Sequence, residues 1–108
     1  MEKFDLVFDE IISKQLRKIA KNLRVKKILS KMFDKLEYRG PFAGKLLDSR
    51  LFVYEMKTKH PPIRLYFKYN STTKEIYIFE FEMKKDKIKQ QKIINKIKNK
   101  ILKIFSKT

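Results

Sequence analysis

Three runs of alternating apolar and polar residues follow one another in the second half of the chain, at Leu51–Thr58, Ile63–Asn70 and Lys74–Lys84. Alternation of this kind is typical of strands that bury one face. Two short polar or proline-containing segments, residues 60–62 and 70–73, separate the runs. Because connections this short join neighbouring strands, the pattern predicts an antiparallel β-meander.

The alternation sorts the side chains of these strands into two sets. The apolar set is predicted to face the core: Phe52, Tyr54, Met56, Ile63, Leu65, Phe67, Tyr69, Tyr77, Phe79, Phe81 and Met83. The polar set is predicted to form an open sheet face: Glu55, Lys57, Arg64, Tyr66, Lys68, Glu80 and Glu82. An open face with cations, a phenol and carboxylates has the groups needed to bind a phosphodiester and to cleave it.

Helical periodicity dominates the first 40 residues. A short strand is predicted at Phe4–Phe8, and Asp9 is a good N-cap for the helix that follows it. Two apolar stripes then recur at helical spacing: Ile12, Leu16, Ile19 and Leu23, followed by Val25, Ile28, Leu29, Met32, Phe33 and Leu36. We expect a tight helical hairpin that ends at Gly40-Pro41, packs on the apolar sheet face and is followed by a loop at residues 42–49.

A last helix is predicted to begin at its cap, Asp86, and to run to about Phe105. Its apolar stripe includes Ile94, Ile97 and Ile101, and we expect this stripe to pack on the sheet. A basic amphipathic helix is also the pattern of a membrane-surface segment, but this one has no Trp. The whole chain, residues 1–108, is thus predicted to be a single α+β domain in which a helical hairpin packs on a small antiparallel meander, with a basic C-terminal helix.

Charge indicates the kind of partner. The chain has 28 Lys and Arg against 12 Asp and Glu, and residues 84–108 hold ten Lys with one acidic residue. The net charge of +16 favours a polyanion, which means nucleic acid, an acidic protein or an anionic membrane. Composition bias also enriches Lys, but it usually raises Glu along with Lys, and here Glu has not kept pace. We therefore expect contact with nucleic acid or the ribosome.

Several classes of protein are excluded or disfavoured by what the sequence lacks. The absence of Cys excludes disulfides, Cys-bound zinc and thiol catalysis. No apolar run approaches the roughly 20 residues that span a bilayer, and the first residues do not have the pattern of a signal peptide. There is no phosphate-loop or dinucleotide motif and no usable spacing of metal ligands. We expect a cytoplasmic protein with no membrane partner, no cofactor and no metal.

Arg64 is the first candidate on the polar face. Its guanidinium offers a rigid fork of donors that suits a phosphate, or the extra negative charge of a phosphoryl-transfer transition state. The alternative is a cross-strand ion pair with Glu55, Glu80 or Glu82, which antiparallel neighbours commonly make. The pattern leaves both interpretations open.

The other candidates each have a structural alternative. Lys57, Lys68, Lys84 and Lys85 can hold a phosphate or move a proton, or they are solvated surface cations. Glu80 and Glu82 are possible general bases, or they balance neighbouring charges. Tyr66 can stack on a base or donate a proton, or it packs in the core. The only His, His60, lies in a proline-rich turn, so catalysis by paired imidazoles is impossible.

The order and spacing of five short motifs resemble the RelE/ParE toxin superfamily, including its HigB-like branch. The motifs are F-D-E-I-I-S-K-Q-L-R-K-I (Phe8–Ile19), M-F-D-K-L-E (Met32–Glu37), V-Y-E-M-K (Val53–Lys57), I-R-L-Y-F (Ile63–Phe67) and F-E-M-K-K (Phe81–Lys85). RelE-type members are toxins that cut messenger RNA in the ribosomal A site, by attack of the ribose 2′-hydroxyl on the adjacent phosphate. The resemblance implies a ribosome-dependent endoribonuclease with an antitoxin partner.

The resemblance also implies roles for individual residues. Arg64 would stabilise the scissile phosphate, Lys57 would be the strand cation, and Lys84 and Lys85 would form the basic pair after the last strand. Independently of the resemblance, we expect nucleic-acid contacts from Lys68, Tyr66, Lys87 and Lys89. RelE members often have a Tyr just beyond the basic pair, whereas residues 87–91 contain none, which leaves the catalytic acid or base unassigned. Two alternatives stay open, a ParE-like toxin that inhibits gyrase and a non-catalytic nucleic-acid-binding relative.

Overall fold

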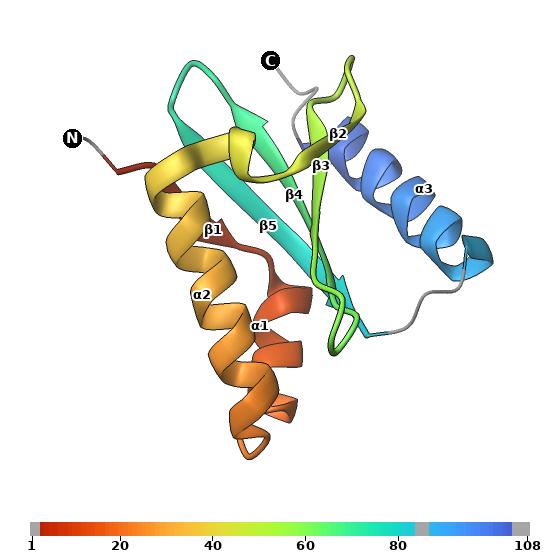
Figure 1. The fold of residues 1–108 in the computed structure, drawn as a ribbon. Coiled ribbons are helices and arrows are strands. Elements are labelled where there is room, and N and C mark those ends of the chain that lie inside the picture. Colours follow the sequence, from red (N-terminus) through yellow and green to blue (C-terminus); the bar gives the residue numbers. More distant parts are fainter. Residues whose placement is uncertain (1–2, 84–86, 105–108) are drawn as a thin grey trace.

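A five-stranded sheet with helices on both faces forms the fold (Figure 1). The computed structural model describes residues 3–83 and 87–104, but not the side chains of 87, 88 and 104. The strand order is β1-β5-β4-β3-β2, in which β1 is parallel to β5 and the other pairs are antiparallel. The elements are β1 (Asp5–Phe8), α1 (Glu10–Lys18), α2 (Leu23–Arg39), η1 (Gly40–Ala43), β2 (Lys45–Asp48), β3 (Val53–Lys57), β4 (Arg64–Asn70), β5 (Glu75–Glu82) and α3 (Lys87–Ile104).

Side-chain caps begin both helices of the hairpin, and the sequence predicts the first of them, Asp9. The Asp9 carboxylate accepts from the Ile11 N–H at 2.9 Å, and the Asn22 side chain accepts from the Val25 N–H at 3.2 Å. These contacts satisfy backbone donors that the first turn of a helix leaves unpaired. The helix α2 ends at Gly40, where φ is +65° and a Cβ would lie 2.5 Å from the Phe4 ring. A side chain at this position would be both strained and obstructed.

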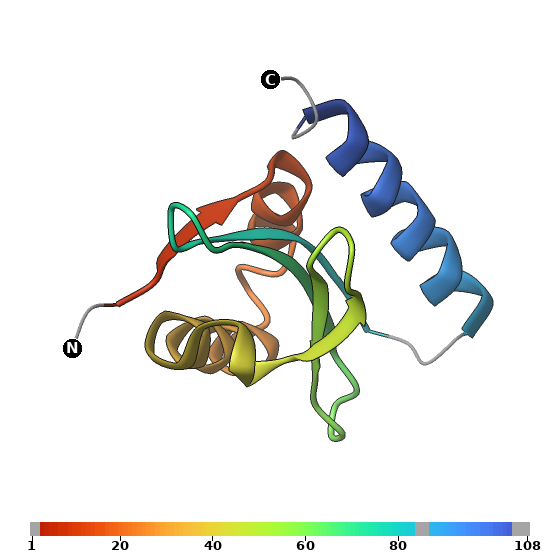
Figure 2. The ribbon, with the colours of Figure 1, turned by 90° about the horizontal axis from the view of Figure 1, so that it is seen from above.

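The two faces of the sheet carry separate apolar clusters. Figure 2 shows the hairpin and α3 on opposite sides of the sheet. The larger cluster lies against the hairpin and joins the inner stripes of α1 and α2 to the sheet. Its buried members are Ile12, Val25, Leu29, Met32, Leu36, Met56, Ile63, Leu65, Phe67, Ile76, Ile78 and Phe81. The smaller cluster lies against α3, and its buried members are Val53, Tyr66, Phe79, Ile97 and Ile101. The α+β class and the C-terminal helix are therefore confirmed.

A β-bulge in β5 corrects the predicted core set. In the pairing with β4, Tyr66 lies opposite Glu80 but Phe67 lies opposite Ile78, so Phe79 is an extra residue. Phe79 packs with the cluster under α3, as does Tyr77, rather than with the hairpin. The prediction that both face the hairpin is wrong, because the bulge makes Phe79 and Glu80 share a face.

Three further predictions need correction. Residues 45–48 were expected in a loop but form β2, which pairs with β3 at the edge of the sheet. Phe52 and Met83 were expected to face the core, but both are exposed, and Phe52 precedes β3 with a φ of +55°.

The helix α3 agrees with the predicted helix over the described residues, whereas the predicted cap, Asp86, lies outside them. No helix among the described residues is long and apolar enough to cross a membrane.

Candidate nucleic-acid interface

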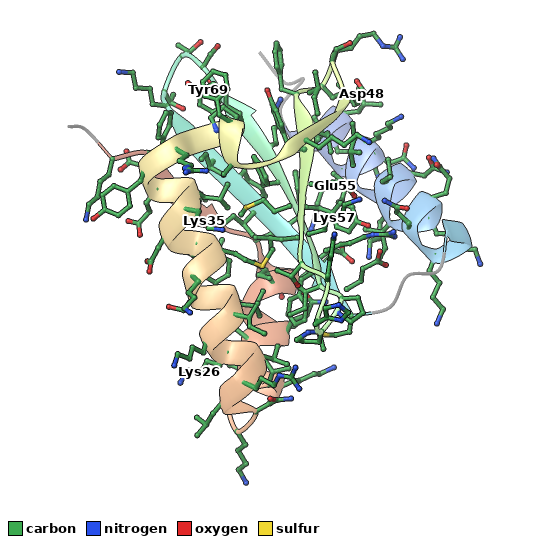
Figure 3. The ribbon with its side chains drawn as sticks, in the orientation of Figure 1. Lys26, Lys35, Asp48, Glu55, Lys57 and Tyr69 are labelled. Atoms are coloured by element: carbon green, nitrogen blue, oxygen red, sulfur yellow. The ribbon has the colours of Figure 1, made fainter. Side chains whose placement is uncertain are left out.

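The polar face of the sheet is the one that α3 covers. Glu55, Tyr66 and Glu80 are buried there, so the expectation of an open face is wrong over much of its area. Figure 3 shows Glu55 and Lys57 on β3, on the side of the sheet toward α3. The part of the face that stays accessible lies at the end of the sheet where β3 ends and β4 begins, beside the first turns of α3.

Arg64, Tyr66 and Glu82 form a hydrogen-bonded cluster at that end. The register places Arg64 opposite Glu82 on β5, with Lys57 opposite Arg64 on β3. The Arg64 Nη1 is 3.2 Å from Glu82 Oε1, and the Tyr66 hydroxyl donates to the same oxygen at 2.8 Å. The side chains of Arg64 and Glu82 are 15% and 11% exposed, so the pair lies near the surface without being fully solvated. The cross-strand ion pair that was one of two interpretations of Arg64 is thus present.

The phenol of Tyr66 is held in its protonated form. Burial, together with the hydrogen bond to Glu82 and the charge of that carboxylate, raises the pKa of Tyr66 well above the ordinary value of 10.0. At neutral pH the Tyr66 hydroxyl therefore donates a hydrogen bond to Glu82 and positions this carboxylate. Because its ring is fully buried, Tyr66 cannot stack on a base while α3 is in place.

An open groove of about 490 Å³ adjoins this cluster. Glu80 and Glu82 of β5 line one side, and Lys89, Lys92 and Ile93 of α3 line the other. Gln15 of α1 also reaches the groove, and its amide both donates to the Phe81 carbonyl and accepts from the Phe81 N–H at 2.9 Å. A groove with cations on one wall and an Arg–Glu–Tyr cluster at its side is suited to a phosphodiester.

Lys57 and Lys68 have different environments. Lys57 is exposed beside Arg64, whereas Lys68 lies four residues further along β4, roughly 13 Å at strand spacing. The Lys68 ammonium donates to the Leu51 carbonyl at 2.6 Å, and burial lowers the pKa of Lys68. The structure therefore brings Lys57, but not Lys68, next to Arg64.

Side chains of α3 contact the two other acidic residues of this face, Glu80 and Glu55. Lys96 contacts Glu80 at 3.0 Å, and the Gln90 amide donates to Glu55 at 2.9 Å. These contacts engage Glu80 as a charge partner of α3, the balancing role that was the alternative to a general base. The sequence analysis missed three polar helix residues: Gln15 and Gln90, which are partly buried, and Lys96, which is exposed. Gln15 carried a readable signal, since it lies one turn after Ile12.

Two more ion pairs fix α3, one to the end of β2 and one to the cap of α1. Lys98 contacts Asp48 at 3.1 Å and Lys100 contacts Asp9 at 2.7 Å. Burial alone would raise the pKa of Asp9, but hydrogen bonds from Lys100, the Ile11 N–H and Tyr77 outweigh it and lower that pKa. The N-cap of α1 is therefore also an anchor for α3.

Some predicted site residues fall outside the described part of the chain. Lys84 and Lys85 belong to residues 84–86, and the side chain of Lys87 is likewise not described. Lys89 does line the groove. Within residues 3–83 and 87–104, no group of three or more His, Asp or Glu has the geometry of a metal site.

Comparisons of sequence find no match, whereas comparison of the fold with solved structures does. No protein-family model matches the chain, and no curated protein matches it in sequence. Its fold is similar to the E. coli RelBE toxin–antitoxin complex, with 22% identity, a TM-score of 0.58 and coverage of 77% of this chain and 99% of the other.

Two further structures are similar. The RelBE2 toxin–antitoxin complex from Mycobacterium tuberculosis aligns with a TM-score of 0.62 and 19% identity, over 80% of this chain and 97% of the other. The isolated E. coli RelE toxin aligns with a TM-score of 0.59 and 19% identity, over 85% and 97%. The chain therefore has the fold of the RelE toxins.

Proposed function

We propose that this protein is the toxin of a toxin–antitoxin pair and that it cleaves messenger RNA on the ribosome in the cytoplasm. The observation that carries this proposal is the Arg64–Glu82–Tyr66 cluster beside a groove whose other wall presents Lys89 and Lys92. The resemblance of the fold to structures named as RelE toxins and RelBE complexes supports it. The net charge of +16 suits both an RNA substrate and an acidic antitoxin.

The chemistry is phosphoryl transfer without a metal or cofactor. A phosphodiester in the groove places its non-bridging oxygens near Arg64, whose remaining donors stabilise the charge that grows in the transition state. The ribose 2′-hydroxyl attacks the phosphorus and the 5′-oxygen of the next nucleotide leaves. Lys57 is the nearest exposed cation on the neighbouring strand and has the phosphate or proton-transfer role.

Glu82 and Tyr66 have a positioning role toward Arg64. Glu82 orients the guanidinium, and Tyr66 fixes the oxygen of Glu82 that Arg64 contacts. Lys84 and Lys85 are proposed as the basic pair after β5, and Lys87 and Lys89 as contacts to the RNA backbone. Glu80 and Glu82 stay candidates for the base that accepts the 2′-hydroxyl proton.

Inducible expression in a growing host, with primer extension on an abundant message, tests the proposal. Wild type should arrest growth and produce discrete in-frame cuts, and Arg64→Ala should lose both by about 100-fold or more, the usual effect of removing one such charge-stabilising group. Arrest without cuts would contradict cleavage, and the absence of both would contradict the toxin function.

Matched variants separate catalysis from folding. Arg64→Lys keeps the charge and the contact with Glu82 but not the fork, so cleavage should fall while the melting temperature changes little. Arg50→Ala removes an exposed Arg outside the groove and should change neither. If Arg64→Lys and wild type cleave equally, the guanidinium has only a structural role.

One observation favours a non-catalytic function. Arg64 is already paired with Glu82, and α3 buries Tyr66 and Glu80, which is the arrangement of a face used for packing. In this case the chain would bind nucleic acid, or gyrase as ParE-like toxins do, without cleaving RNA. DNA supercoiling assays that change on addition of the protein would favour gyrase, and binding that weakens steeply with salt would favour a nucleic-acid-binding protein.

A further inference from the structure

The groove beside the Arg64 cluster is lined by apolar side chains as well as charged ones. Met83 follows β5 and is 37% exposed, and Ile93 of α3 is half-buried. The groove has a volume of about 490 Å³. A pocket of this size accommodates a small organic ring, and thioether and aliphatic side chains make favourable contacts with the face of such a ring. The groove therefore has room for a nucleobase next to a phosphate.

Two of the polar side chains that line this groove are engaged within the protein. The Gln15 amide uses both its oxygen and its nitrogen on the backbone of Phe81, each at 2.9 Å. Both carboxylate oxygens of Glu80 contact the Lys96 ammonium, at 3.2 Å and 3.0 Å. A group that already has a partner must give it up before it can bind a ligand, and this loss offsets the gain. Gln15 and Glu80 are therefore poorly suited to recognise a base.

Glu82 differs, because only one of its two carboxylate oxygens is engaged. Oε1 accepts from the Arg64 guanidinium at 3.2 Å and from the Tyr66 hydroxyl at 2.8 Å. Oε2 has no hydrogen-bond or ion-pair partner within the part of the chain that the structure describes. The two hydrogen bonds to Oε1 and the low exposure of the side chain, 11%, fix the carboxylate at the wall of the groove. Oε2 is thus a fixed acceptor whose lone pairs are available to a ligand.

A fixed carboxylate oxygen distinguishes between nucleobases by their hydrogen-bond donors. Adenine, cytosine and guanine each have an exocyclic amino group that can donate to a carboxylate. The N3–H of uracil lies between two carbonyl oxygens, and their partial negative charges repel a carboxylate that approaches it. A site that presents such an acceptor therefore favours the bases with an amino group over uracil.

We propose that Oε2 of Glu82 recognises the exocyclic amino group of one unstacked RNA base, while Met83 and Ile93 contact the face of its ring. The choice of RNA as the ligand rests on the proposed function. Oε1 holds Arg64, which binds the neighbouring phosphate, so one carboxylate joins recognition of the base to the position of the guanidinium. An oxygen that holds a base cannot also accept the proton of the 2′-hydroxyl. This inference therefore assigns Glu82 to base specificity and not to proton transfer.

Ligands that differ by one amino group test this assignment without any cleavage readout. The probe is a fluorescent RNA pentamer whose central base is flanked by abasic nucleotides, and its binding to the full chain is followed by anisotropy at fixed salt concentration. Adenine should bind about tenfold more tightly than purine, which lacks the amino group, and cytosine about tenfold more tightly than pyrimidin-2-one. The two members of each pair have the same ring, so the stacking contacts are matched. Equal binding within both pairs would overturn the proposal.

The variant Glu82→Gln tests the residue itself. Because Oε1 accepts from two donors, the Gln carbonyl oxygen must take its place, and the amide nitrogen then replaces Oε2. The acceptor becomes a donor, so the tenfold preference for adenine over purine should disappear. Glu10→Gln removes an exposed carboxylate of α1 outside the groove and should keep the full preference. A preference that persisted in Glu82→Gln would show that another group recognises the base.

Two further variants separate recognition of the base from general affinity. Met83→Ala should weaken the adenine and purine pentamers to the same extent, because it removes a contact with the ring and none with the amino group. Lys92→Ala should also weaken both, and it should reduce the salt dependence of binding, as expected of a phosphate contact. Both side chains are exposed, so the melting temperatures should stay close to that of wild type. A changed preference in either variant would contradict the assignment to Glu82.

Failure of this inference and failure of the proposed function give different results. A protein that distinguishes the pentamers, but neither arrests growth nor cuts messenger RNA, would remove the proposed function and leave the base-recognition site in place. A protein that cuts messenger RNA, but binds the members of each pair equally, would keep the proposed function and overturn the site. The absence of measurable binding to any of the pentamers would likewise overturn the site.

Discussion

The two faces of the sheet are stabilised in different ways. The hairpin face closes on a continuous apolar cluster to which α1, α2 and four strands contribute. The α3 face has five buried residues in its cluster, surrounded by ion pairs from Lys96, Lys98 and Lys100. Apolar burial supplies most folding free energy, whereas ion pairs supply less and are arranged by geometry and charge. The comparison separates a face that maintains the fold from the face on which we propose the chemistry.

Two phenylalanines provide the largest test of this comparison, since both are almost fully buried but on opposite faces. Phe67→Ala should lower the free energy of unfolding by about 3 to 5 kcal/mol, because it opens a cavity in the main cluster. Phe79→Ala should lower it by less, because its cluster is smaller, and the α3 amides should lose protection before those of α2. Urea denaturation and native-state hydrogen exchange measure both effects, and equal losses with equal loss of protection would contradict the distinction.

An intermediate effect is expected at Asp9, where α3 is fixed to the start of α1. Asp9→Asn keeps a good N-cap but removes the charge that Lys100 contacts, so it should cost about 1 to 2 kcal/mol at neutral pH. The pKa of Asp9 lies below its unfolded value of 3.8, so its contribution is complete above that pH and is lost as the pH falls through the folded pKa.

The difference between wild type and Asp9→Asn should therefore shrink in acid. Thermal denaturation between pH 3 and pH 7 measures it. Lys14→Ala is the matched control, because it removes an exposed i,i+4 contact with Glu10 and should change stability by at most about 0.5 kcal/mol. A constant difference across this range would show that the Asp9 charge does not stabilise the fold.

The smallest expected effect is the late ionisation at alkaline pH of two phenols on the α3 face, those of Tyr66 and Tyr77. Burial and the Asp9 contact raise the pKa of Tyr77 to about 12, and burial and Glu82 raise the pKa of Tyr66 further. The unfolded chain ionises these phenols near pH 10, so their contribution to stability is present below pH 10 and decreases as the pH rises. Tyrosinate absorbance should show a late component that Tyr66→Phe and Tyr77→Phe each reduce. Early ionisation of both would contradict the packing of α3.

The sequence predicts the polar face well where the alternation is strict. In β3 and β4 one set of alternate residues is apolar, which is why Glu55, Lys57, Arg64 and Lys68 were placed on one side correctly. The pattern fails in β5, where Ile76 to Phe79 are all apolar and no residue type marks the bulge. Where both faces of a strand are apolar, alternation cannot show which side chains face the hairpin and which face α3.

The residues of the candidate site could be predicted from the sequence, but their contacts with one another and with α3 could not. Arg64, Tyr66 and Glu82 could be named from their shared face, and cross-strand register then decides which of them touch. The apolar stripe of α3 was also predictable from its spacing. The position of α3 over the polar face was not, because it depends on contacts between residues distant in sequence, such as that of Lys96 with Glu80. Short β2 was missed because four residues are too few for a periodic signal.

The pairing of β1 with β5 has a consequence for synthesis of the protein. This pairing, and the two bonds of Gln15 to Phe81 that lie 66 positions apart, join the first elements of the chain to the last strand. Contacts of such high sequence separation form late, because a long loop must close before they contribute. A nascent chain therefore cannot complete its sheet, or bring Glu82 to Arg64, until β5 has left the exit tunnel. The groove, which Lys89, Lys92 and Ile93 of α3 also line, forms only after both β5 and α3 have been synthesised.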